Sequence, residues 1–212
     1  MNLLIFGSTG LVGSSLLEQL KLEHNVTIAV RDKSKLSLKN VEVRQINFEE
    51  FDSFKTLQYD GVYCCLGTTI KTAGSKENFK KVDLDYVELC FKYSIACESN
   101  FFCVVSALGA NSESKVFYNK VKGMMEDRLI GDQKSIIVRP SLLLGHRKEH
   151  RPLEKFSTTL LGPFTRPLQL LLKKYAPIEA YEVAKSMIEL SMSGETQSHI
   201  EYIIKQPGRS LA

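Results

Sequence analysis

The chain has no tryptophan among its 212 residues, no long apolar run and no block of charge of one sign. A membrane-spanning helix requires about 20 consecutive apolar residues, so no membrane is expected as a partner. The 28 basic and 24 acidic residues are scattered and give a net charge of +4. A nucleic-acid-binding protein gathers its basic residues into a patch or stripe, so nucleic acid is not an expected partner either.

Cysteine is also scarce, with five residues and no CxxC spacing. Cys64 and Cys65 are adjacent, and the odd total among apolar neighbours is typical of reduced, buried thiols. The first apolar run, at 2–6, has no basic leader before it. These observations predict a cytoplasmic protein. No group of cysteines and histidines has the spacing of a metal site, so none is expected.

Short apolar runs alternate with helical patterns. The runs lie at Leu3–Phe6, Val26–Val30, Val41–Ile46, Val62–Leu66, Phe101–Ser106, Ile136–Arg139 and, more weakly, Ile200–Ile204. The helical patterns lie at Leu11–Lys21, Glu49–Leu57, Lys76–Glu98, Lys115–Ile130 and Ile178–Ser191. Strands that are apolar on both faces and separated by helices form a parallel sheet covered on both sides. The sequence therefore predicts an α/β fold, a doubly wound parallel sheet of the Rossmann type, as one domain over residues 1–212.

One stretch, residues 142–177, interrupts the alternation. It has no strand-like run and holds four of the six prolines. In open α/β sheets, ligands bind beyond the carboxyl ends of the strands. An irregular insertion late in the chain is well placed to cover that crevice. We therefore expect 142–177 to be a small C-terminal segment covering a small-molecule substrate.

The strongest local motif is a glycine-rich turn, GSTGLVG at 7–13, directly after the first strand and opening the first helix. Gly7 suits a tight turn, Gly10 a close approach of backbone to pyrophosphate, and Gly13 close packing of helix on strand. The helix N-terminus then faces an anion. A Walker A loop is excluded because Ser14 follows Gly13 where a lysine is required. The turn predicts a dinucleotide cofactor.

The end of the second strand indicates which dinucleotide binds. An acidic residue there would hold the ribose hydroxyls of NAD, whereas an arginine would pair with the 2′-phosphate of NADP. Arg31 follows the run at 26–30, which favours NADP. Asp32 comes next, so NAD remains possible, and a solvated turn is the alternative reading of these charges.

Tyr118 and Lys122 form a YxxxK pair on the helix after the fifth strand. The i,i+4 spacing puts both side chains on one face, where the ammonium would lower the phenol's pKa and suit it for acid or base catalysis. Ser106, at the end of the fifth strand, would hydrogen-bond the same substrate oxygen. A second YxxxK, Tyr181 to Lys185, lies on a late helix and is expected to pack at the surface.

These motifs resemble the atypical branch of the short-chain dehydrogenase/reductase family. Within it they are more similar to the family of the human HIV Tat-interacting oxidoreductase, which is related to NmrA-like and nucleoside-diphosphate-sugar epimerase-like proteins. The resembling segments are GSTGLVG at 7–13, YCCLGTTIKTAG at 63–74, KVDLDYV at 81–87, YNKVKG at 118–123 and RPSLLLGHRKEHRP at 139–152.

The resemblance implies roles for particular residues. Pyrophosphate contacts would come from Gly7, Ser8, Thr9, Gly10, Leu11 and Val12; the 2′-phosphate contact from Arg31; the adenine contact from Asn47; flanking contacts from Leu66, Gly67 and Thr68; the catalytic pair from Tyr118 and Lys122, with Ser106 as third member; and contacts near the nicotinamide from Arg139, Pro140 and Ser141. The chain departs from the family pattern at Asp32, Asn47 and Ala107, where arginine, aspartate and serine are common.

Three functions are compatible with these motifs. The first is an NADP(H)-dependent oxidoreductase that transfers hydride to or from a small carbonyl or alcohol, with Tyr118 as acid or base. The second is a non-catalytic NAD(P)H-binding redox sensor or regulatory module that binds a protein partner. The third, a nucleoside-diphosphate-sugar epimerase, is disfavoured because 212 residues leave little chain to enclose a nucleotide sugar. A monomer or a homodimer is expected.

Overall fold

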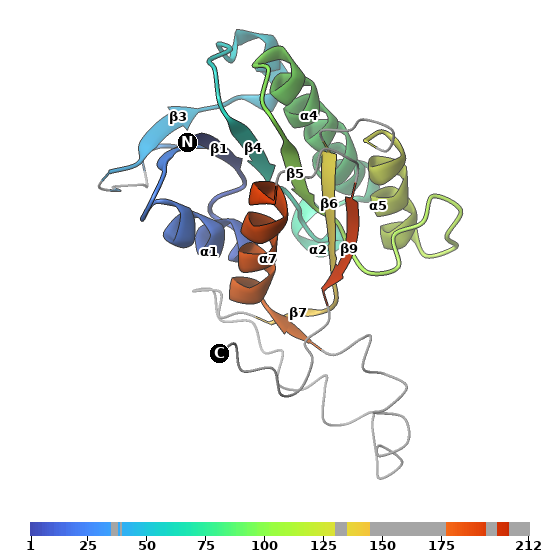
Figure 1. The fold of residues 1–212 in the computed structure, drawn as a ribbon. Helices are drawn as coiled ribbons and strands as arrows, with labels where there is room; N and C mark the ends of the chain where they lie inside the picture. The colour runs from blue at the N-terminus through green and yellow to red at the C-terminus, as the bar shows by residue number, and fades with distance from the viewer. Residues whose placement is uncertain (35–37, 39, 130–134, 145–176, 194–198, 204–212) are drawn as a thin grey trace, which may run out of the picture.

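A computed structural model describes residues 1–34, 38, 40–129, 135–144, 177–193 and 199–203. Its centre is a seven-stranded sheet in the order β3-β2-β1-β4-β5-β6-β9 (Figure 1). The strands are β1 (Asn2–Phe6), β2 (Asn25–Val30), β3 (Glu42–Gln45), β4 (Gly61–Cys64), β5 (Phe102–Val105), β6 (Ser135–Pro140) and β9 (His199–Ile203). Every neighbouring pair is parallel. The predicted doubly wound Rossmann sheet is confirmed, with the strand order reversing next to β1.

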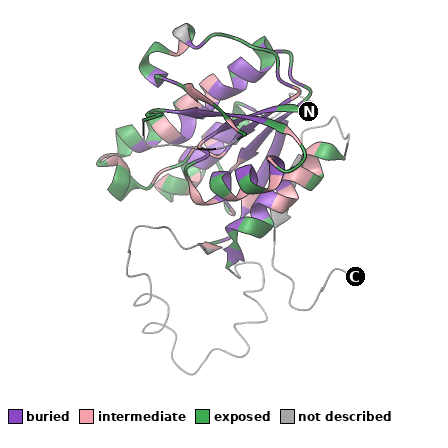
Figure 2. Cartoon of the chain, turned by 90° about the vertical axis from the view of Figure 1, so that its left-hand side faces the viewer, coloured by how far each residue is buried: buried purple, intermediate pink, exposed green. Residues whose placement is uncertain are grey.

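The sheet is buried on both faces, as its apolar runs require. Alternate residues of one strand enter different cores: Leu4 and Phe6 pack on one side, Leu3 and Ile5 on the other. All four are fully buried. Figure 2 shows the buried strands at the centre and exposed positions on the outer faces of the helices. Strict alternation of two apolar sets explains why these runs form parallel strands with helices on both sides.

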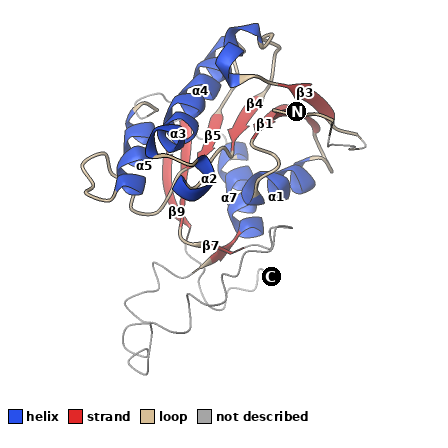
Figure 3. Ribbon diagram, turned by 180° about the vertical axis from the view of Figure 1, so that it is seen from behind, coloured by secondary structure: helices blue, strands red, loops and turns tan. Residues whose placement is uncertain are grey.

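Two helices cover one face and the remaining helical segments cover the other. α1 (Leu11–Leu20) and α7 (Ala180–Met192) pack together in front of the sheet in Figure 1. The opposite face, nearest the viewer in Figure 3, carries η1 (Phe48–Ser53), α3 (Lys76–Lys80), η2 (Lys81–Asp85), α4 (Tyr86–Ala96) and α5 (Phe117–Asp127). A short helix, α2 (Ile70–Ala73), follows β4. The cores on both faces hold the carboxyl ends of the strands in fixed positions.

Three expectations about elements are corrected. The helix predicted at 76–98 is divided by η2, a π-helical turn. The segment predicted as a helix at 49–57 is instead the 3₁₀ helix η1, which contains a kink at Glu50. Finally, the stretch 142–177 does contain a strand: β7 (Leu143–Leu144) pairs with β8 (Ile178–Glu179), so α7 begins two residues later than predicted. A two-residue bridge is too short to leave a periodic pattern in the sequence.

Most of the expected substrate-covering segment, residues 145–176, lies outside the described residues. The two strands on either side of residues 145–176, β7 and β8, are paired with each other below the carboxyl end of β6 (Figure 1). None of the described helices has the length and apolar character needed to span a membrane.

Candidate functional site

The glycine turn after β1 has the close packing that its sequence predicted. Gly7 has φ of +78°, and a Cβ on it would lie 2.6 Å from the Cys65 backbone. A Cβ on Gly13 would lie 2.2 Å from the Gly7 carbonyl oxygen, so α1 rests directly on the turn. A Cβ on Gly10, by contrast, would lie 3.4 Å from the Gly7 carbonyl oxygen, an ordinary van der Waals contact. Gly10 forms the N-cap of α1 without a side-chain hydrogen bond, which leaves the first amides of the helix for an anion.

A cavity of about 710 Å³ opens at the carboxyl ends of the central strands. Of the predicted site residues it is lined by Gly10, Leu11, Val12, Leu66, Gly67, Thr68, Ser106, Tyr118, Lys122, Pro140 and Ser141. The glycine turn, the loop after β4 and the YxxxK pair therefore share one space. Its volume lies within the range of small-molecule and cofactor sites. Gly7, Ser8, Thr9, Arg31, Asn47 and Arg139 do not line it.

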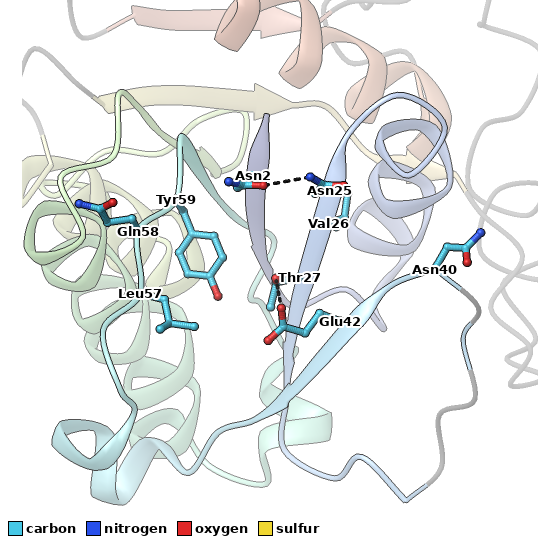
Figure 4. Close-up of a pocket in the computed structure, with 9 residues that line it drawn as sticks. All are labelled: Asn2, Asn25, Val26, Thr27, Asn40, Glu42, Leu57, Gln58 and Tyr59. Atoms are coloured by element: carbon cyan, nitrogen blue, oxygen red, sulfur yellow. Dashed lines mark hydrogen bonds between the residues drawn. The ribbon is translucent and has the colours of Figure 1, made fainter.

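A second hollow, of about 300 Å³, lies at the opposite end of the sheet (Figure 4). It is lined by residues that begin β1 and β2, among them Asn2 and Asn25, whose side chains are hydrogen-bonded to each other. Ligands of parallel α/β sheets bind at the carboxyl ends of the strands. This hollow lies at the amino ends and contains no predicted site residue, so the larger cavity is the candidate site.

Lys122 is held by a buried carboxylate that the sequence reasoning did not assign. Its Nζ lies 2.9 Å from Asp83 Oδ1, and the two side chains are only 4% and 1% exposed. The other oxygen of Asp83 accepts a hydrogen bond from the Thr68 amide at 2.9 Å. Asp83 lies on the π turn η2, which brings it to the loop after β4. Burial lowers the pKa of Lys122, but the charge of Asp83, its hydrogen bond to Lys122 and the Tyr118 phenol together outweigh burial and raise that pKa.

Tyr118 lies in the first turn of α5 at the mouth of the cavity, and 38% of the residue is exposed. Its ring packs against Phe79 at 5.7 Å between centroids. The sequence predicted a lowered pKa for this phenol. Instead the pKa is raised, because burial favours the neutral phenol and the Asp83 charge opposes the lowering by Lys122. The phenol is therefore protonated at neutral pH and able to donate a proton.

Ser106 directly follows β5 and is buried, with its hydroxyl in a very short hydrogen bond to Glu126 Oε1. Glu126 in turn accepts hydrogen bonds from Arg139 Nε at 2.9 and 3.1 Å. The Arg139 guanidinium is thus paired with Glu126 beneath Ser106, while its neighbours Pro140 and Ser141 line the cavity. This pairing explains why Arg139, predicted to lie near the nicotinamide, does not line the cavity.

Arg31 and Asn47 lie outside the cavity, at the carboxyl ends of the neighbouring strands β2 and β3, and both are exposed. The Asp32 carboxylate accepts hydrogen bonds from the Ser34 amide at 2.9 Å and the Ser34 hydroxyl at 2.6 Å. Both hydrogen bonds end on Oδ1 of Asp32, the acidic residue that made NAD an alternative. The Asn47 side-chain oxygen accepts a hydrogen bond from the Glu49 amide at 3.1 Å, which caps η1.

The residues present fit a dinucleotide. Gly10 lines the cavity, and the amino end of α1 that begins there has no side-chain cap, so both suit a pyrophosphate. The Ser8 hydroxyl beside them is buried and has no hydrogen-bond partner within the described part of the chain. Among those same residues, no three His, Cys, Asp or Glu side chains are grouped to hold a metal ion.

Sequence reasoning missed two carboxylates of the site, Asp83 and Glu126. Glu126 follows Tyr118 and Lys122 at another interval of four, so the three residues share one face of α5. Continuing the YxxxK pattern by one step would have found it. Asp83 lies in the segment KVDLDYV, but its contact with Lys122 depends on tertiary packing that no spacing reveals.

A sequence model described as NAD(P)H-binding matches residues 7–141, which include the glycine turn, the loop after β4 and the YxxxK pair. The chain belongs to this NAD(P)H-binding family. Membership agrees with the cavity, since the matched segment supplies every predicted site residue that lines it.

Named relatives extend this family assignment over most of the chain. Protein FMP52, mitochondrial, of Candida albicans is 33% identical over 207 residues, covering 92% of this chain and 89% of that protein. Protein HTATIP2 of Rattus norvegicus is 32% identical over 169 residues, covering 74% of this chain and 69% of that protein. The second match confirms the resemblance stated from the sequence motifs.

Solved structures of other proteins share the fold at low identity. The oxidoreductase ylbE from Lactococcus lactis has a TM-score of 0.67 at 18% identity, covering 94% of this chain and 89% of that chain. MoeE5, in complex with UDP-glucose and NAD, has a TM-score of 0.71 at 11% identity, covering 96% of this chain and 76% of that chain. Identities this low show a common Rossmann architecture and leave the reaction to be argued from the site.

The prediction of a cytoplasmic protein is wrong. The FMP52 proteins of Candida albicans and Debaryomyces hansenii, each 33% identical over more than 90% of this chain, both carry the name mitochondrial. The prediction rested on reduced cysteines and the lack of long apolar runs. Those features suit the interior of a mitochondrion as well as the cytosol, so composition had no power to separate the two compartments.

Proposed function

We propose that this chain is an NADP(H)-dependent oxidoreductase that transfers hydride between the cofactor and a small carbonyl or alcohol. The observation that carries the proposal is the shared cavity, in which Tyr118 and Lys122 face the same space as the glycine turn. A bound nicotinamide would supply or accept the hydride. Gly10, Leu11 and Val12 would hold the pyrophosphate, and Pro140 and Ser141 would lie beside the nicotinamide.

Tyr118 acts as the proton donor in the direction of carbonyl reduction. Its raised pKa keeps the phenol protonated at neutral pH, and its place among the residues that line the cavity supports a contact with an entering carbonyl. Lys122, fixed by Asp83, supplies a positive charge that favours the phenolate left after the proton is transferred. The pair therefore lowers the cost of forming an alcohol from a carbonyl.

Arg31 is proposed to select NADP over NAD. It is exposed at the end of β2, whereas the neighbouring Asp32 carboxylate is hydrogen-bonded to Ser34. We therefore assign the contact with the 2′-phosphate to the Arg31 guanidinium, with the Asp32 carboxylate turned to Ser34. Arg31→Ala should weaken NADPH binding by about tenfold or more, the worth of a charge-assisted contact to phosphate, and leave NADH binding unchanged.

The Arg31 prediction is measured by titration of nicotinamide fluorescence, with Lys92→Ala as control. Lys92 is an exposed cation of α4 that pairs with Glu88, remote from β2, so the control should bind both cofactors as wild type does. Equal loss of NADPH and NADH affinity in Arg31→Ala would remove the argument for NADP selectivity.

Tyr118→Phe tests the catalytic assignment. NADPH oxidation is followed with a panel of small aldehydes and ketones, and the variant should lose about 100-fold or more of the wild-type rate, the usual contribution of a positioned acid. NADPH affinity should be unchanged. Tyr181→Phe is a matched control, since Tyr181 also begins a YxxxK but is 54% exposed on α7. Wild-type turnover in Tyr118→Phe, with NADPH bound, would contradict the assignment.

A non-catalytic NAD(P)H sensor is the second candidate. It is favoured by the raised pKa of Tyr118, since burial and the Asp83 charge oppose the lowering by Lys122 that would activate the phenol. A sensor would bind NADPH in the titration and oxidise it with no member of the panel. A protein partner would then read the cofactor state.

The compartment proposed for this chain is the mitochondrion, as in the names of the FMP52 relatives. The proposed architecture is one Rossmann domain over residues 1–212, with 142–177 covering the substrate. A cover of this length fits a small substrate that enters beside Tyr118.

A further inference from the structure

Four of the apolar residues that line the cavity come directly after predicted site residues in the chain. Ala107 and Leu108 belong to the loop after β5, and Leu142 and Leu143 follow β6. The predicted cofactor contacts include none of the four. Ala107 is buried, Leu108 and Leu143 are partly buried, and Leu142 is 69% exposed. We call these four residues the apolar subsite.

Backbone hydrogen bonds hold the two halves of the apolar subsite together. The Leu108 amide donates to the Pro140 carbonyl at 2.9 Å, which joins the loop after β5 to the end of β6. The Ile178 amide donates to the Leu142 carbonyl at 2.9 Å, and Leu143 pairs with Ile178 in the bridge between β7 and β8. The apolar subsite therefore stands on backbone that its neighbours hold in place.

The described lining of the cavity offers no unpaired positive charge. Its charged residues are Asp83 and Lys122, whose side chains are 1% and 4% exposed and form an ion pair at 2.9 Å. A carboxylate or phosphate entering beside the apolar subsite would lose water without gaining a counter-charge, which is unfavourable. A hydrocarbon chain, by contrast, is stabilised when it leaves water for apolar side chains. The lining therefore favours an uncharged, apolar ligand group at this position.

We infer that the apolar subsite binds the hydrocarbon part of an uncharged aldehyde or ketone, whose carbonyl oxygen meets the Tyr118 hydroxyl. This inference rests on the proposed function and names its substrate class. Tyr118 lines the same cavity and has a protonated phenol. In reduction, the carbonyl carbon receives the hydride of NADPH and the oxygen receives the Tyr118 proton, which gives an alcohol and NADP⁺. Sugars and carboxylated carbonyl compounds are poor substrates.

A matched pair of ketones tests the inference without any turnover. 6-Methylheptan-2-one and 5-oxohexanoate share a carbonyl and a chain, and differ in that two methyl groups of the first are carboxylate oxygens in the second. Each is titrated calorimetrically into the full chain in the presence of NADP⁺, which cannot reduce a ketone. The first should bind about tenfold or more tightly than the second, the worth of two buried methyl groups. Equal affinities, tighter binding of 5-oxohexanoate, or binding of neither would overturn the inference.

Turnover of the same two ketones with NADPH separates the inference from the proposed function. The value of kcat/KM should favour 6-methylheptan-2-one by the same factor. If that ketone binds in the calorimeter and oxidises no NADPH, the proposed function loses support and the apolar subsite stands. If both ketones are reduced with equal kcat/KM, the proposed function stands and the inference fails.

Leu142→Lys tests the position of the apolar subsite. The side chain is 69% exposed and the Leu142 carbonyl keeps its bond to Ile178, so the variant should fold. The new ammonium should tighten 5-oxohexanoate binding by about 2- to 5-fold, the worth of a partly exposed ion pair, and weaken binding of 6-methylheptan-2-one. Leu22→Lys is the control, because Leu22 is 78% exposed between α1 and β2, at the amino ends of the strands. A wild-type preference in Leu142→Lys would contradict the inference.

Discussion

At the residue scale, two buried ion pairs organise the site. Lys122 pairs with Asp83, and Glu126 pairs with Arg139, so each charge on the inner face of α5 has a partner on another element. Breaking a buried pair by removing one charge typically costs about 3–5 kcal/mol, because the remaining charge is buried alone. The pairs therefore fix the position of α5 as well as the electrostatics around Tyr118.

Asp83→Asn tests the electrostatic part of this description. Removing a negative charge near the phenol favours the phenolate, so the pKa of Tyr118 should fall relative to wild type. Lys122 would lose its partner, and the free energy of unfolding should decrease by about 3–5 kcal/mol. Tyrosinate absorbance, with the Tyr118→Phe titration subtracted, gives the first quantity, and urea denaturation gives the second.

Asp85→Asn is the matched control for this substitution. Asp85 lies two residues further along η2, with an exposed side chain 3.5 Å from Arg128. An exposed ion pair contributes about 0–1 kcal/mol, so this control should leave both stability and the Tyr118 titration nearly unchanged. A Tyr118 titration that does not move in Asp83→Asn would show that the carboxylate has no influence on the phenol.

At the element scale, the carboxyl ends of the strands and the helices that follow them build the site. The seven apolar runs predicted all seven strands of the sheet, since strands buried on both faces leave continuous apolar segments. The glycine turn was predictable because each glycine has a steric reason. The π turn η2 was not, because one extra residue within a helix does not change its apolar spacing enough to be read.

The site residues were predictable to the extent that they lie on one element. Tyr118 and Lys122 were predictable from spacing on one helix, whereas Asp83 and Arg139 reach α5 from η2 and β6. Contacts between elements depend on tertiary packing, which local periodicity does not predict. The lowered pKa predicted for Tyr118 is wrong for this reason, since the spacing reveals Lys122 but neither the burial of the phenol nor the Asp83 charge, both of which raise the pKa.

Two glycine substitutions in one turn separate folding from binding. Gly10→Ala should change stability by less than about 1 kcal/mol, because its nearest neighbour is 3.4 Å away, yet weaken NADPH binding by about tenfold or more. Gly13→Ala should destabilise the fold by about 1–3 kcal/mol, because its Cβ would lie 2.2 Å from the Gly7 carbonyl oxygen. Denaturation and fluorescence titration measure both; unchanged NADPH affinity in Gly10→Ala would contradict the pyrophosphate assignment.

At the scale of the whole molecule, the sheet brings the glycine turn and Tyr118 to one cavity at the carboxyl ends of its strands. The carboxyl ends of β1, β4, β5 and β6 surround a cavity of about 710 Å³, and the family match over residues 7–141 covers all of its lining except Leu142 and Leu143. The alternation of apolar runs and helical patterns predicted the class of fold, whereas composition predicted the wrong compartment, because cysteine usage and the lack of long apolar runs are shared by the cytosol and the mitochondrion.

A crystal structure of the full chain with NADP⁺ would test the proposed hydride transfer. We expect the pyrophosphate over the amides of Gly10 to Val12, the 2′-phosphate at Arg31, and the nicotinamide between Pro140 and the Tyr118 hydroxyl. A cofactor bound elsewhere, or a nicotinamide facing away from Tyr118, would contradict the proposed hydride transfer.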